Sequence, residues 1–162
     1  MRVIGIDPGI NGAIIAIDED GTVDGMDLPT LGEGTQRELN AQQLLTWVIH
    51  QCPDLIACEL VSSMPGQGVA SSFRFGFATG QLRAVMQCSH VPYALYTPSK
   101  WKRHYGLKGG DKEKSRQLAL RLFPKAAELL RLKKHHQRAE AILIANYAHM
   151  RMNNVQHPRM AG

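Results

Sequence analysis

Apolar residues near the amino terminus fall into two short runs that are separated by a turn. The first run, Val3, Ile4 and Ile6, ends at Asp7, and the second covers residues 13–17 after a Pro8-Gly9 pair. Short apolar runs divided by a Pro-Gly turn are typical of a buried strand and an antiparallel return strand. Asp7 therefore closes a buried strand, where a carboxylate is costly unless another group pairs with it.

The rest of the chain alternates between strand and helix patterns. Further strands are predicted over 22–28, 55–59 and 91–96. A helix is predicted to start near Asn40, its N-cap, and to end before Pro53. Further helices are predicted over 69–88, from Pro98, from Asp111 to 123, from Pro124, and over 137–152. This order predicts an α/β fold with a mixed sheet whose fourth strand lies beside the first. We expect one domain over residues 1–152 and a flexible tail over 153–162.

Composition favours a single globular domain without a membrane segment. The chain has 162 residues, of which 44% are hydrophobic and 20% are charged, enough to bury a core. Its three cysteines lack the CxxC spacing of zinc sites, so reduced thiols are expected. We see no signal peptide and no apolar run near the roughly 20 residues needed to span a bilayer. A cytoplasmic protein is expected.

Positive charge is concentrated in the second half of the chain. The formal net charge is +5, and between residues 100 and 134 Lys and Arg far outnumber the acids Asp111, Glu113 and Glu128. A one-sided basic segment suits binding to a phosphate backbone, because each neutralised phosphate releases counterions. A solvated basic face would give the same composition, so charge alone leaves both interpretations open.

Three acids on three separate apolar elements indicate a metal site. Asp7 and Glu59 each close an apolar strand, and Glu140 lies within an apolar helix. Carboxylates suit Mg²⁺, and two ions held about 4 Å apart would suit phosphodiester hydrolysis. His136 precedes Glu140 by one helical turn and shares its face. It could be a ligand or a general base, or only a solvated histidine.

These residues belong to a series of motifs that resembles one family. The chain is similar to the RuvC-like Holliday junction resolvases, particularly the short forms of phages and prophages. The motifs lie in the order of the family over nearly the whole chain. They are residues 4–9 with 12–13, the acid Glu59, and residues 64–76, 97–102, 111–116 and 138–141.

The resemblance implies an RNase H-like fold, with a five-stranded mixed sheet flanked by helices. It also implies a homodimer that nicks four-way junctions and related branched DNA symmetrically in the cytoplasm of a bacterium or a phage-infected host. Mg²⁺, with Mn²⁺ as a substitute and two ions per site, would be the cofactor, and no small-molecule cofactor is expected. The helix after Glu59 would lie at the dimer interface, where Gly76, Gly80 and Ala84 form a stripe. The same stripe could instead pack on the sheet.

The resemblance also assigns residues to DNA. It places Lys114 near the scissile phosphate, with Lys102 as a second candidate, and it makes Phe73 and Phe75 candidates for stacking at a junction. Core packing is the alternative for these aromatic side chains. The remaining DNA-binding candidates are Arg74, Lys108 and Lys112.

One departure from the family concerns the last helix. The family places two acids there, whereas this chain has only Glu140, preceded by His135 and His136. We expect His136 to replace the missing acid, with His135 as the alternative, so the expected catalytic and metal set is Asp7, Glu59, Glu140 and His136. Three other functions are considered: a non-catalytic or weakly catalytic binder of branched DNA, an RNase H-like RNA-processing nuclease, and an ATPase, suggested by the Asp-Pro-Gly turn.

Overall fold

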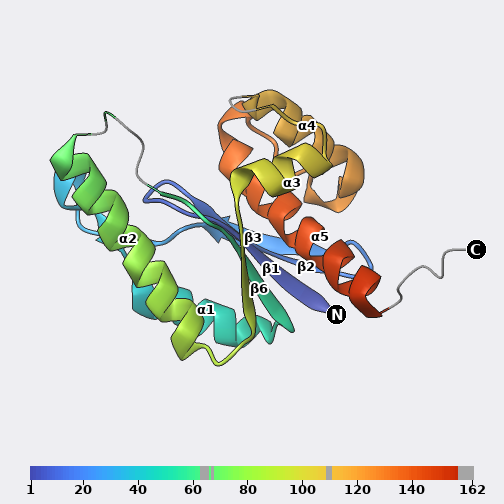
Figure 1. Cartoon of the computed structure of the whole chain (residues 1–162), viewed down its shortest axis with the longest axis horizontal. Helices are drawn as coiled ribbons and strands as arrows, with labels where there is room; N and C mark the ends of the chain where they lie inside the picture. The colour runs from blue at the N-terminus through green and yellow to red at the C-terminus, as the bar shows by residue number, and fades with distance from the viewer. Residues whose placement is uncertain (63–65, 67, 109–110, 157–162) are drawn as a thin grey trace, which may run out of the picture.

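A five-stranded mixed sheet forms the centre of the computed structural model (Figure 1), which describes residues 1–62, 66, 68–108 and 111–156. Across the sheet the strands run in the order β3 (Val23–Asp27), β2 (Ala13–Asp18), β1 (Arg2–Asp7), β6 (Leu55–Glu59) and β7 (Tyr93–Tyr96). The first three are antiparallel neighbours, whereas β6 is parallel to both β1 and β7. The predicted mixed sheet, with its fourth long strand beside the first, is confirmed.

Helices cover both faces of this sheet (Figure 1). On one face lie α1 (Ala41–Gln51) and α2 (Val69–Cys88), and on the other α3 (Pro98–His104), α4 (Lys112–Leu122) and α5 (His136–Gln156). Alternate side chains of β1 and β2 point into the two apolar cores, which explains why these strands are apolar throughout. None of the described helices is long and apolar enough to cross a membrane.

The structure differs from the predicted elements in four places. A small second sheet, β4 (Thr30–Leu31) with β5 (Glu38–Leu39), and the turn η1 (Gly34–Gln36) lie between β3 and α1, where the sequence predicts no helix or strand. The last helix continues to residue 156, into the expected tail, whose residues 157–162 lie outside the described residues. A further short turn, η3 (Lys133–His135), precedes that helix.

The helix predicted from Pro124 was wrong. Only a single 3-10 turn forms there, η2 (Pro124–Ala126). Arg116 of α4 donates a hydrogen bond to the backbone carbonyl of Leu130 at 2.7 Å. In a continuing helix the carbonyl of Leu130 would point along the helix axis towards a backbone N–H of the next turn. Here it accepts from the side chain of Arg116 instead, as a carbonyl in a turn can.

Helix α5 lies unusually close to β1 because Gly5 has no side chain. A Cβ atom at Gly5 would overlap the carbonyl oxygen of Ala141 and lie 2.7 Å from the backbone nitrogen of Ala145. Ala141 and Ala145 are fully buried at this contact. The close approach fixes the height of α5 above the sheet, and with it the position of Glu140, the residue before Ala141.

Candidate active site

Two of the predicted acids are the last residues of neighbouring parallel strands, so they lie at the same edge of the sheet. The parallel register pairs Ile6 with Cys58, so Asp7 and Glu59 follow side by side. After Asp7 the chain turns back sharply towards β2. This turn requires Gly12, because a Cβ atom there would overlap the carbonyl oxygen of Asp7. The strand register and the turn therefore place both carboxylates at one edge.

A cleft of about 360 Å³ opens beside Asp7. Its walls come from the turn after β1 and from α3, α4 and α5: residues 7–12, Lys102, Lys112, His136, Gln137 and Glu140. Three of the four expected catalytic residues thus share one cleft. Glu59 is 8% exposed and is not part of the cleft wall.

The acids influence one another electrostatically. Burial raises the pKa of Asp7 well above its usual value, and the charges of Glu140 and Glu59 raise it further, whereas Lys102 and Lys112 lower it. Burial also raises the pKa of Glu59, against the opposing effects of its Trp101 hydrogen bond and of Lys102. Negative charges gathered in a desolvated place favour protons or a cation.

Helix α3 supplies a partner to each of the other two acids. The indole nitrogen of the fully buried Trp101 donates to Glu59 Oε1 at 3.0 Å. The ammonium of Lys102 lies 3.2 Å from Glu140 Oε2, and the hydroxyl of Ser115 donates to Glu140 Oε1 at 3.5 Å. Neither Trp101 nor Ser115 was predicted from the sequence. Trp101 does leave a signal, since a buried indole N–H usually needs an acceptor.

The donor set fits a hard divalent cation by its chemistry. Asp7, Glu59 and Glu140 offer carboxylate oxygens, the ligands that Mg²⁺ prefers, and the ammonium of Lys102 is a stand-in cation beside Glu140. Within the part of the chain that the structure describes, however, no three His, Cys, Asp or Glu side chains converge closely enough to hold an ion. The site therefore presents suitable ligands that are not yet gathered around one point.

The two adjacent histidines of the last helix region lie in different surroundings. His136 lines the cleft, and burial lowers its pKa, assisted by Lys112 and opposed by Glu140. The Nδ1 atom of His135 instead accepts a 3.4 Å hydrogen bond from the backbone N–H of Leu132, and His135 is not among the cleft residues. The geometry brings His136, and not His135, to the acids.

The predicted basic residues separate into two groups. Lys102 and Lys112 line the cleft. Lys114 is 71% exposed, forms a 2.6 Å ion pair with Asp111 and does not line the cleft. Lys108 is exposed on the chain between α3 and α4. The structure thus brings two of these four lysines to the acids.

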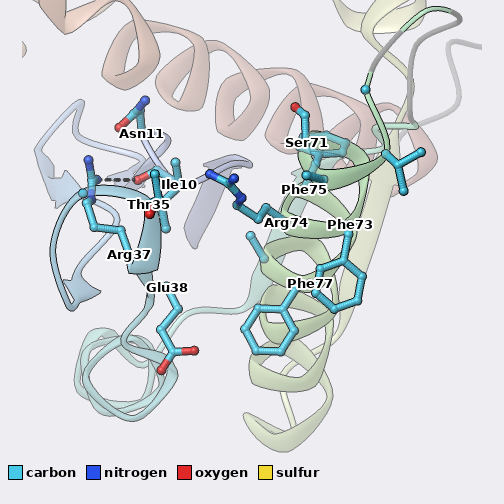
Figure 2. Close-up of a pocket in the computed structure, with 15 residues that line it drawn as sticks. Ile10, Asn11, Thr35, Arg37, Glu38, Ser71, Phe73, Arg74, Phe75 and Phe77 are labelled. Atoms are coloured by element: carbon cyan, nitrogen blue, oxygen red, sulfur yellow. Dashed lines mark hydrogen bonds between the residues drawn. The ribbon is translucent and has the colours of Figure 1, made fainter.

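A larger groove, of about 830 Å³, runs along the start of α2 (Figure 2). One wall is the segment 34–38, and the other carries Phe73, Arg74 and Phe75, so all three α2 candidates line this groove. Phe73 is 73% exposed and stacks with Phe77 at a centroid distance of 6.5 Å. Figure 2 shows Arg74 reaching between the two walls.

Helix α2 also turns its small-residue stripe outward. Gly76, Gly80 and Ala84 are exposed, and among the described residues no atom lies within 4 Å of a Cβ built at either glycine. Within this chain the stripe therefore does not pack on the sheet, and the second of the two interpretations of its spacing is wrong.

Comparison with known proteins gives a consistent result. No family model matches the chain. Thermus thermophilus RuvC in complex with a Holliday junction substrate superposes with a TM-score of 0.59 at 19% identity, over 94% of this chain and 96% of that one. The yeast mitochondrial Holliday junction resolvase Ydc2 gives a TM-score of 0.54 at 14% identity, over 97% and 82%.

A curated relative adds similarity in sequence. The chloroplastic Holliday junction resolvase MOC1 of Chlamydomonas reinhardtii is 33% identical over 91 residues, which is 56% of this chain but 10% of that protein. The match thus spans about a tenth of the relative. The structural neighbours confirm the fold that the motifs predict. The chain has the RNase H-like fold of the RuvC and mitochondrial Holliday junction resolvases.

Proposed function

We propose that this protein is a metal-dependent endonuclease that nicks four-way junctions and related branched DNA symmetrically as a homodimer. One observation carries the proposal. At one edge of a resolvase-type fold, Asp7 and Glu140 line one cleft with Lys102 and Lys112, and the charge of the neighbouring Glu59 acts on Asp7. The arrangement combines metal ligands with cations for a phosphate, as phosphodiester hydrolysis requires.

Asp7, Glu59, Glu140 and His136 would hold Mg²⁺ or Mn²⁺, with two ions per site. Bound ions supply an activated water and stabilise the leaving oxygen. Because the pKa of His136 is lowered, its imidazole is largely neutral at pH 7 and has one unprotonated nitrogen. That nitrogen would coordinate the ion or, when it is not a ligand, accept a proton from the attacking water. Lys102 and Lys112 line the same cleft and would orient the phosphate that is cut.

The α2 groove is proposed to hold the bases near the branch point. An exposed aromatic ring such as Phe73 can stack on an unpaired base without reading its identity. Arg74 and Phe75 line the same groove, which combines a cation with a second aromatic surface. Lys108 and Lys114, both exposed near α4, would contact the phosphate backbone beyond the cleft.

A homodimer would supply two active sites to the two strands of a junction with twofold symmetry. The outward stripe Gly76, Gly80 and Ala84 supports the face of α2 as the interface, because small residues let two helices approach closely. The exposed side chain of Phe77, next to Gly76, adds apolar surface to this face.

Substrate choice is tested by comparing three labelled nucleic acids of equal length: a four-way DNA junction, linear duplex DNA and structured RNA. We expect tight binding and Mg²⁺-dependent nicking of the junction alone. Preferred binding and cutting of the RNA would establish an RNA-processing nuclease instead. Tight junction binding without nicking in Mg²⁺ or Mn²⁺ would leave a structural binder of branched DNA.

A further inference from the structure

Lys102 is the cation of the acid cluster in this structure. Its ammonium lies 3.2 Å from Glu140 Oε2, and the two side chains are only 20% and 14% exposed. Its charge also lowers the pKa of Asp7 and of Glu59. One ammonium therefore acts on all three carboxylates that are proposed to hold the metal.

The backbone that carries Lys102 is fixed. The neighbouring Trp101 is fully buried and donates a hydrogen bond to Glu59. One turn later, the hydroxyl of Tyr105 donates to the carbonyl of Leu143 in α5 at 3.2 Å. With its Cα atom held on both sides, Lys102 can move its charge only through its flexible four-carbon side chain, which lines the open cleft.

Lys112 provides a comparison within the same cleft. Its side chain is exposed, and within the described residues it acts on Asp7 and His136 through its charge, without an ion pair. Of the lysines that the structure describes, Lys102 is the one that combines a direct ion pair to a candidate metal ligand with a charge effect on the other two acids. A metal ion that binds Glu140 must therefore displace the ammonium of Lys102 but not that of Lys112.

We propose that Lys102 is an internal counter-ion that competes with the divalent metal for Glu140, and that metal binding frees its ammonium to bind the phosphate of the DNA. This inference rests on the proposed metal site. A carboxylate can hold the ammonium or coordinate an ion, and a doubly charged ion attracts several carboxylates more strongly than an ammonium does. Metal binding must break the Lys102–Glu140 pair. Removing the ammonium should therefore strengthen metal binding.

The test is calorimetric titration of the full chain with Mg²⁺, without DNA, at pH 8, where protons compete least for the acids. We expect Lys102→Met, which keeps the length of the side chain but not its charge, to lower the Kd for Mg²⁺ by about tenfold. Lys112→Met should change the Kd less, and Lys100→Met, which alters an exposed lysine of α3 outside the cleft, should not change it. Lys102→Arg keeps the charge and should not tighten binding.

The outcomes separate this inference from the proposed function. If Asp7→Asn abolishes Mg²⁺ binding while Lys102→Met leaves the Kd unchanged or raises it, the counter-ion role is wrong and the metal site stands. If neither the wild type nor Lys102→Met takes up Mg²⁺ or Mn²⁺, both the metal site and this inference fail. Thermal unfolding of each variant, followed by circular dichroism, shows that affinity is compared between folded proteins.

Discussion

Asp7 is held in a place that disfavours its charge. Burial and the nearby acids raise its pKa, so the folded protein keeps this proton to a higher pH than the unfolded chain does. The free energy of unfolding of the metal-free protein therefore falls as pH rises from the ordinary carboxyl range through the raised pKa. Every tenfold difference in proton affinity between the folded and unfolded chains corresponds to about 1.4 kcal/mol. An ionisable group whose charged form destabilises the folded protein is typical of functional sites.

Replacing Asp7 with Asn should therefore stabilise the metal-free protein. In EDTA at pH 7 we expect a Tm several degrees above wild type, with the difference shrinking as the pH approaches 4. Asp27→Asn is the matched control, because Arg138 lowers the pKa of Asp27 and its loss should destabilise the protein at neutral pH. Equal Tm values for wild type and Asp7→Asn at pH 7 would contradict this account of the site.

Single residues of the site were predictable where a local pattern decided their position, as for Asp7 and Glu59 at the ends of apolar strands. Glu140 and His136 share a helix face by their four-residue separation, and both line the cleft. The hydrogen bond from Trp101 to Glu59 depends on how α3 docks against the sheet. No local pattern in the sequence encodes that packing, so Trp101 was missed.

At the scale of elements, the contact between α5 and β1 sets the geometry of the site. Gly5→Ala would force the helix away from the strand, and we expect a loss of about 1–3 kcal/mol or more in the free energy of unfolding. Urea unfolding measures this loss. Gly68→Ala is the control, since its φ is −60° and its Cβ would meet no described atom within 4 Å. A Gly5→Ala protein as stable as Gly68→Ala would show that α5 is not held at this height.

The sequence predicted the long elements better than the short ones. Helices α1 and α2 form over the predicted residues, because apolar periodicity and caps such as Asn40 act locally. The short elements are held by distant partners. Gln81 of α2 accepts a hydrogen bond from the backbone N–H of Leu39 in β5 and donates one to its carbonyl, and Arg116 donates to the carbonyl of Leu130 after the turn at Pro124. Two-residue strands carry too little pattern to be recognised in advance.

At the scale of the whole molecule, symmetric nicking of a junction requires two copies of the chain. Gly80→Arg places a long charged side chain on the exposed stripe of α2 and should shift the protein from dimer to monomer in sedimentation velocity. It should also convert paired junction nicks into single ones. Gln42→Arg, at an exposed position of α1, should remain dimeric. A monomeric wild type at micromolar concentration, or a dimeric Gly80→Arg, would contradict the proposed interface.

The order of the motifs along the chain predicted the architecture of the whole molecule. The motif at 4–9, Glu59 and the segment 138–141 anticipated the RNase H-like fold, because each marks a fixed element of that fold. The basic bias of residues 100–134 was less specific, since it places lysines both in the cleft and outside it. Only the folded structure shows that Lys102 and Lys112 line the cleft and that Lys114 does not.

The most direct measurement is the nicking of a mobile four-way DNA junction in Mg²⁺ by wild type, Glu140→Gln and His136→Ala, with the bound fraction measured in the same samples. We predict paired symmetric nicks by the wild type, and loss of nicking with binding retained in Glu140→Gln. His136→Ala should cut more slowly, whereas His135→Ala, outside the cleft, should cut as wild type does. Undiminished nicking by Glu140→Gln would contradict the metal centre on which the account depends.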